Sequence, residues 1–83
     1  MTNKRREEIR VKLNDIFCDV FDDDTINIFE EMTSNDLDEW DSLMHITLIV
    51  NIEQEFNIQL DAAEIGNLEN VGKMLTLLDE RSQ

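Results

Sequence analysis

The sequence contains no proline and no tyrosine, and only two of its 83 residues are glycine. Sheets joined by tight turns normally need proline and glycine, so this scarcity argues against an all-β protein. Leucine, isoleucine, glutamate and aspartate are abundant instead, and 41% of the residues are hydrophobic, which is enough for a small core. The sequence therefore predicts an all-α protein, and its length predicts a single domain over residues 1–83.

Cysteine occurs once, at Cys18, which excludes a disulfide within the chain and a zinc site built from thiolates. We expect this thiol to be reduced and mostly inert. No stretch approaches the roughly 18 consecutive apolar residues of a membrane span. The basic start, MTNKRREEI, is not followed by the apolar stretch of a signal peptide. These absences predict a cytoplasmic protein with no membrane association.

Basic residues are also scarce, and the formal net charge is −13. Five of the seven basic residues lie near the N-terminus, namely Lys4, Arg5, Arg6, Arg10 and Lys12. Residues 13–72 contain no lysine or arginine. A surface of one negative sign repels nucleic-acid phosphates and anionic lipid, and it attracts basic protein surfaces. We therefore expect protein partners and no nucleic acid, although acidity that serves only solubility stays open as an alternative.

Apolar periodicity predicts the helices. They are expected over residues 5–20, from 41 or 42 to 56 or 57, for one or two turns within 61–66, and over 70–79. The first has an apolar stripe of Ile9, Leu13, Ile16, Phe17 and Val20, and the last is expected to bury Val71, Met74, Leu75 and Leu78. The prediction is a small four-helix bundle with three longer helices and one short helix.

Residues 22–40, between the first two helices, are long for a loop and contain several apolar side chains. Such a loop is expected to pack over the domain and to include one helical turn, capped by Thr33 or Ser34. Its acidic start, from Asp22, does not form a calcium-binding EF-hand, because Asn27 replaces the required glycine and Thr33 replaces the bidentate glutamate. No metal site is predicted.

The second long helix is apolar on two sides. At about 100° per residue, the predicted core side contains Leu48, Ile49, Ile52 and Phe56. The other side contains Leu43, Ile46 and Val50 with Thr47 and Gln54, and Met44 and Glu53 lie at its margins. A helix of this kind is either fully buried or has a second partner. The long loop could cover this second side, or the side could remain open as a strip for protein docking.

Ser42, at the head of this helix, has the surroundings of a modified residue rather than a nucleophile. A catalytic serine needs a base within hydrogen-bond reach and a group that orients the base. His45, the single histidine, follows three positions later. Asp41 is adjacent to the serine and is poorly placed to orient the imidazole of His45. No glycine-rich oxyanion element accompanies them. We therefore predict no catalytic residues, and interpret Ser42 as a helix cap or as a hydroxyl that another enzyme modifies.

The Asp-Ser-Leu motif at residues 41–43 is followed by MHITLIVNIEQEFNIQL, in which Glu-x-x-Phe at 53–56 precedes the apolar pair Ile58 and Leu60. Together with the acidity and the order of the helices, this pattern resembles the acyl carrier protein family over nearly the whole chain. The resemblance implies that Ser42 receives 4'-phosphopantetheine from coenzyme A through a magnesium-dependent phosphopantetheinyl transferase. The terminal thiol of the arm would then hold acyl groups as thioesters, and the protein itself would not be an enzyme.

The resemblance also implies partners and a docking surface. The partners would be the transferase and acyl-activating, condensing or transfer enzymes with basic docking surfaces, and the carrier would act as a monomer. The expected docking residues are Asp41, Leu43, Met44, Ile46, Val50 and Glu53. Trp40 precedes the motif where fatty-acid carriers usually have a small residue, which favours a specialised pathway over housekeeping fatty-acid synthesis. The alternative is an unmodified acidic interaction domain, acting as an adaptor or inhibitor.

Overall fold

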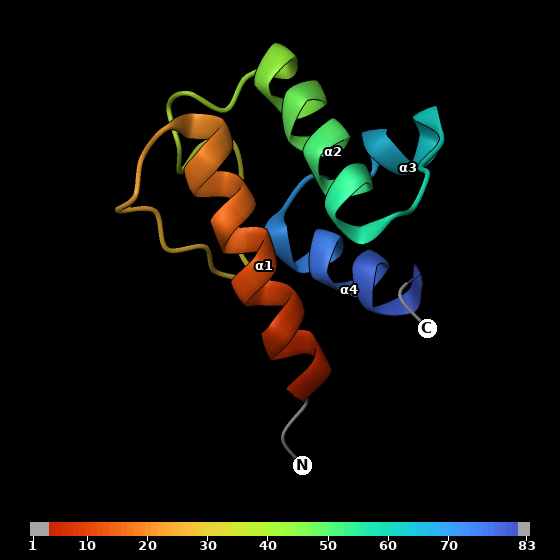
Figure 1. Ribbon diagram of the computed structural model, residues 1–83. Coiled ribbons are helices and arrows are strands. Elements are labelled where there is room, and N and C mark those ends of the chain that lie inside the picture. Colours follow the sequence, from red (N-terminus) through yellow and green to blue (C-terminus); the bar gives the residue numbers. More distant parts are fainter. Residues whose placement is uncertain (1–3, 82–83) are drawn as a thin grey trace.

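The computed structural model describes residues 4–81, which form four helices and no strand (Figure 1). The helices are α1 (Lys4–Phe21), α2 (Ser42–Phe56), α3 (Ala62–Gly66) and α4 (Val71–Arg81). The predicted all-α fold is confirmed, with three longer helices, one short helix and a long first loop. The observed helix ends lie within about two residues of the predicted ones, as expected for ends placed from sequence patterns.

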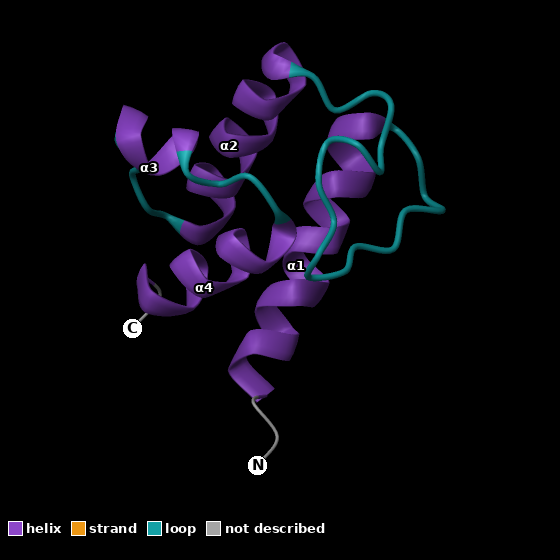
Figure 2. Ribbon diagram, turned by 180° about the vertical axis from the view of Figure 1, so that it is seen from behind, coloured by secondary structure: helices purple, strands orange, loops and turns teal. Residues whose placement is uncertain are grey.

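Helix α1 packs against both α2 and α4, and the loop from α1 to α2 runs along one side of the helices (Figures 1 and 2). The chain enters α2 at the end of the molecule opposite the start of α1 (Figure 1). Within residues 4–81, no helix is both long and apolar enough to cross a membrane.

The core is one cluster to which three helices and the loops contribute. Its most enclosed members are Phe17, Leu13, Leu48, Ile49, Ile52, Met74, Leu75, Leu78 and Val71. Two predicted core residues lie at the margin instead: Val20 and Phe56 are half-buried and pack against the cluster. At the end of α1, Phe21 is buried in the place expected for Val20, and it contacts the Phe17 ring at a centroid distance of 5.8 Å.

The long loop is held to the helices through its backbone. The Asn14 side chain accepts a hydrogen bond from Ile28 N at 2.8 Å and donates one to Ile26 O at 3.1 Å. Near the other end of the loop, Thr33 caps a single turn as predicted, although the turn does not continue as a helix. Its Oγ1 accepts the N–H of Asn35 at 3.2 Å, its carbonyl accepts the N–H of Asp36, and Thr33 N donates to the Asp36 carboxylate at 2.9 Å.

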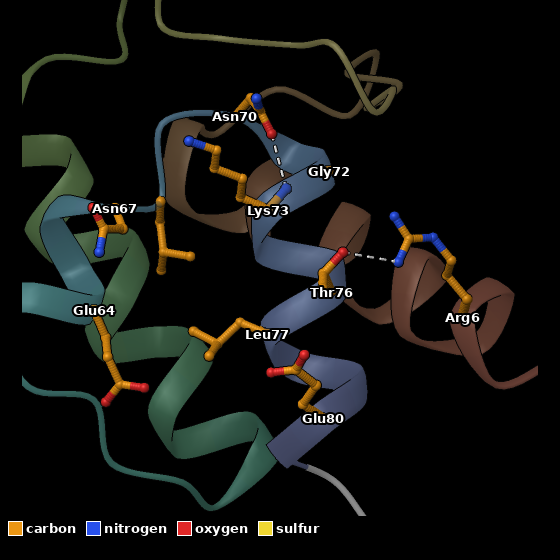
Figure 3. A pocket seen from close by; sticks show the side chains of 10 residues that line it. Arg6, Glu64, Asn67, Asn70, Gly72, Lys73, Thr76, Leu77 and Glu80 are labelled. Carbon is orange, nitrogen blue, oxygen red and sulfur yellow. Dashed lines mark hydrogen bonds between the residues drawn. The ribbon is translucent and has the colours of Figure 1, made fainter.

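The start of α4 also fastens this loop. The N–H groups of Val71 and Gly72 donate to Met32 O and Glu30 O at 3.0 and 2.8 Å. A Cβ at Gly72 would lie 3.0 Å from Glu30 O, so the close approach of the two backbones favours glycine there. The predicted cap of α4 is confirmed, because Asn70 Oδ1 accepts the N–H of Lys73 at 2.8 Å (Figure 3). The predicted capping box of Asp61 and Glu64 is also present, at the start of α3.

Candidate functional site

Ser42 is the first residue of α2, and it is exposed. The residue that caps the helix is Asp41, with extended backbone angles of φ −107° and ψ −173°. Its Oδ1 accepts the N–H of Met44 at 2.9 Å, and its carbonyl accepts the N–H of His45 at 2.8 Å. The interpretation of Ser42 as a cap is therefore wrong, and its hydroxyl does not serve the helix start.

The electrostatics at Ser42 favour an anion. The first N–H groups of an α-helix lack partners within the helix, and the helix dipole places a partial positive charge at this end. Within the first turn of α2 there is no acidic residue, and the one carboxylate at this helix end is that of the cap Asp41, which accepts the N–H of Met44. A phosphate group bound to a residue at this position would lie where helix N-termini commonly bind anions.

No base is directed at Ser42. The two ring nitrogens of His45 have other partners, since Nδ1 lies 3.1 Å from Trp40 Nε1 and Nε2 lies 3.3 Å from Ile65 O. The ring therefore bridges the end of the loop and α3. Among residues 4–81, no group of three or more His, Cys, Asp or Glu side chains is placed to hold a metal ion. The serine can react only with a base supplied from elsewhere.

A surface hollow of about 530 Å³ adjoins Ser42 between the start of α2, α3 and the segment before α4. Its apolar members include Trp40, Ile46, Ile65 and Leu68, and its polar members include Ser34, Ser42, His45 and Glu69. An extended arm with alternating methylene and amide groups would find both apolar contacts and hydrogen-bonding partners there. The residues around Ser42 thus fit a phosphopantetheine group.

The second side of α2 is open. Leu43, Ile46 and Val50 are 74%, 52% and 44% exposed, and Met44 is half-buried at the margin. The loop does not cover this side, which rules out one of the two explanations of the two-sided helix. We call Leu43, Met44, Ile46 and Val50 the apolar strip.

Polar side chains along this side bond to the helix itself. Thr47 Oγ1 donates to Leu43 O at 3.2 Å, and Asn51 Nδ2 donates to Thr47 O at 2.8 Å. The first acidic residue within α2 is Glu53, near its end. The middle of this side therefore offers apolar contact and little charge.

Glu53 has a structural contact that the sequence did not indicate. It is half-buried, and its Oε2 accepts the N–H of Leu60 at 2.8 Å. The helix ends at Phe56, and the following residue, Asn57, is in the left-handed conformation with φ 55° and donates its N–H to Glu53 O. Glu53 thus fixes the turn that leads to α3. Helix periodicity alone gives no signal for such a bond between a side chain and the backbone of a later turn.

Another hollow, of about 520 Å³, lies against α4 (Figure 3). Three of its charged side chains form ion pairs: Arg6 with Glu30, Lys73 with Glu69 and Glu64 with Arg81. Arg6 also donates to Thr76 Oγ1 at 3.3 Å, as Figure 3 shows. These contacts join α1, α3 and α4 to their neighbours.

Comparison with known proteins identifies the family. The family model described as "Phosphopantetheine attachment site" matches residues 11–78, which include Ser42. Among solved structures, the holo acyl carrier protein from Geobacter metallireducens is 43% identical and superposes with a TM-score of 0.79. That match covers 83% of this chain and 79% of the other. The chain belongs to the acyl carrier protein family. No curated protein gives a significant match.

Membership of this family settles the broad role of the molecule. It is an acyl carrier protein, a carrier and not a catalyst, and its cofactor is covalently attached 4'-phosphopantetheine. The cofactor supplies a thiol that holds acyl groups as thioesters. Proteins of this family interact with phosphopantetheinyl transferases and with acyl-handling enzymes.

Proposed function

We propose that Ser42 is the attachment point of the phosphopantetheine arm. The observation that carries the proposal is the placement of this serine. It is exposed at the first position of α2. Because its neighbour Asp41 provides the cap, the Ser42 hydroxyl is available for modification. The Ser42 oxygen forms the new bond to the pantetheine-side phosphate of coenzyme A, the nucleotide bisphosphate leaves, and the hydroxyl proton passes to a base of the transferase.

We also propose that partner enzymes dock on the apolar strip. Its three most exposed members lie on the side of α2 that no other element covers, beginning next to Ser42. Asp41 and Glu53 stand near its two ends, where their charges would attract a basic surface. A partner that fits would have an apolar centre and basic residues at its margins.

The uncharged middle of α2 supports the proposal of a specialised pathway. Met44, Thr47 and Gln54 occupy positions where fatty-acid carriers commonly have acidic or strongly polar side chains, and Trp40 replaces a small residue before the motif. Enzymes that recognise acidic residues along this helix would find few here. Monomeric state and cytoplasmic location remain predictions.

The attachment point is tested by intact mass after incubation with coenzyme A, Mg²⁺ and a broad-specificity phosphopantetheinyl transferase. The wild type is expected to gain the mass of one arm, and Ser42→Ala is expected to gain none. Ser34→Ala is the matched control, since Ser34 is an exposed serine beside the same hollow. Modification of Ser42→Ala would show that the arm attaches elsewhere, and a wild type without added mass would favour the unmodified adaptor.

A further inference from the structure

The aromatic rings of Trp40 and His45 form a bridge at the Ser42 end of α2. The indole Nε1 lies 3.1 Å from His45 Nδ1, and His45 Nε2 lies 3.3 Å from Ile65 O. The planes of the two rings are inclined by only 17°, and their centroids are 6.0 Å apart. These are the single tryptophan and the single histidine of the chain. Attachment at Ser42 assigns no role to either ring.

The partners of the ring indicate which of its nitrogens accepts a hydrogen bond. An indole nitrogen can only donate, so His45 Nδ1 must accept and cannot itself have a proton. A neutral imidazole then has its proton on Nε2, which donates to the carbonyl of Ile65. Adding a second proton would place an N–H at Nδ1 opposite the N–H of Trp40. Two donors at this distance cannot bond, and one of the rings must move.

On one side, the bridge holds the residue that introduces the attachment motif. Trp40 is 5% exposed and packs edge-on against Phe17 of α1, with a centroid distance of 5.3 Å. It is followed directly by the cap Asp41 and by Ser42. A displaced indole would therefore disturb the first turn of α2, where the transferase must reach the serine hydroxyl.

On the other side, the bridge holds a helix with little packing of its own. No residue of α3 is buried, so polar contacts contribute much of its attachment. One is the ion pair of Glu64 with Arg81, and another is the bond of Ile65 O to His45. Elements with few buried apolar contacts open at low free-energy cost. The bond between His45 and Ile65 O is therefore one of the few contacts that fix α3 beside the hollow, together with the ion pair of Glu64 and the packing of Ile65 against the core.

We propose that neutral His45 is a positioning residue that holds Trp40 and α3 around Ser42, and that protonation of its ring breaks the bond to Trp40 and so opens the bridge on that side. The effect on modification rests on the proposed role of Ser42, whereas the bridge itself does not. The carrier would then present an ordered attachment site at neutral pH and a loosened one in acid.

The charged groups around the ring are carboxylates. The hollow that His45 lines contains Asp41 of the α2 cap and Glu69 of the segment before α4, and none of its lining residues is basic. On α3, the neighbouring Glu64 is paired with Arg81. On the loop before α2, Asp38 and Glu39 are exposed. A protonated ring would thus have acidic neighbours, and no cation of the hollow would replace it as a donor to Ile65.

The bridge is tested by the indole N–H signal of Trp40 in nuclear magnetic resonance spectra, which is unambiguous because the tryptophan is unique. Spectra of the wild type, His45→Gln and His45→Ala are compared at about pH 7.5 and about pH 5.5, on either side of the range in which histidine side chains ordinarily titrate. A glutamine amide also offers one acceptor and a donor but does not titrate.

We expect the wild-type indole signal to shift reversibly on acidification and the His45→Gln signal to stay fixed. The His45→Ala signal should resemble acidified wild type at both pH values. If the wild-type signal is the same at both pH values, or if His45→Gln shifts as the wild type does, the proposal is overturned. Should His45→Ala fail to fold in thermal melts, the comparison of wild type with His45→Gln still decides.

The positioning role is tested by the rate of modification under the same conditions, each variant being compared with wild type at equal pH. At about pH 7.5, His45→Ala is expected to be modified about fivefold more slowly, a factor that corresponds to one hydrogen bond, and His45→Gln at nearly the wild-type rate. At about pH 5.5, His45→Gln should become faster than wild type. Equal rates for all three proteins would overturn the positioning role. A wild type that is never modified would refute the attachment at Ser42, while the indole signal would still test the bridge.

Discussion

Ile46 and Ile52 provide a matched test of the two sides of α2, because the same substitution falls on opposite sides of one helix. Ile52 is 1% exposed, and truncation of a buried isoleucine to alanine costs about 2–5 kcal/mol. A chain of 83 residues has a free energy of unfolding of about 4–12 kcal/mol. A loss of about 3 kcal/mol would therefore lower Tm by about 12–24 °C, at about 4–8 °C per kcal/mol.

Ile46 is 52% exposed, so it contributes only about half of the roughly 1.5–3 kcal/mol of a fully buried side chain. Part of that loss is offset, because alanine has the higher helix propensity. The net loss is at most about 1 kcal/mol, so Ile46→Ala should lower Tm by no more than about 8 °C. It should instead slow the modification of Ser42, with little dependence on salt, since apolar contacts at the centre of an interface act mainly on dissociation.

The assays are thermal melts of both variants and transferase kinetics over a series of ionic strengths, carried out well below the Tm of Ile52→Ala. Folded Ile52→Ala should be modified at nearly the wild-type rate, which separates stability from docking. If Ile46→Ala lowers Tm by more than Ile52→Ala does, the two sides of α2 have been assigned in reverse. The proposal that partners dock on the apolar strip would then be refuted as well.

Asp41→Asn should keep the helix cap, because asparagine caps as well as aspartate, and should slow modification at low salt but not at high salt. Glu53→Gln should behave in the same way, since its amide oxygen can still accept the N–H of Leu60; a slowing that persists at high salt would show that charge is not the cause. For Cys18, burial and then the nearby charge of Asp24 raise the pKa of the thiol, so its contribution to stability is fully present below the ordinary thiol pKa and is lost as pH rises above it. Urea titrations at about pH 7 and about pH 10 should show that the free energy of unfolding falls more for wild type than for Cys18→Ala between these pH values. Equal decreases would contradict the environment assigned to Cys18.

Local patterns predicted the elements and the exposed strip of α2 because they depend on residues close in sequence. Helix periodicity separated buried Leu48 and Ile49 from exposed Leu43, and the spacing of Asp61 and Glu64 predicted a capping box that is present. Such features repeat every three or four residues, so one sequence is enough to find them. The motif at residues 41–43 led to the family in the same way, and the family match confirms it.

The long loop was predicted less well, because its conformation depends on groups distant in sequence. Backbone atoms of Ile26 and Ile28 bond to the Asn14 side chain, and the backbone of residues 30 and 32 bonds to the start of α4. Thr33 caps a turn as expected, but these contacts leave that turn isolated, where a helical turn was expected. These hydrogen bonds join residues at irregular sequence separations, so periodicity in the sequence does not reveal them.

His45 shows the same limit at the functional site, and it also explains why Ser42 needs a partner. From the sequence, this histidine was a candidate base one helical turn beyond the serine. In the structure, both of its ring nitrogens bond elsewhere, to Trp40 and to the carbonyl of Ile65, which lies 20 residues further along the chain. A ring that holds the site together cannot also deprotonate Ser42, because its accepting nitrogen is already occupied. The proposed attachment at Ser42 therefore requires that the base come from the transferase.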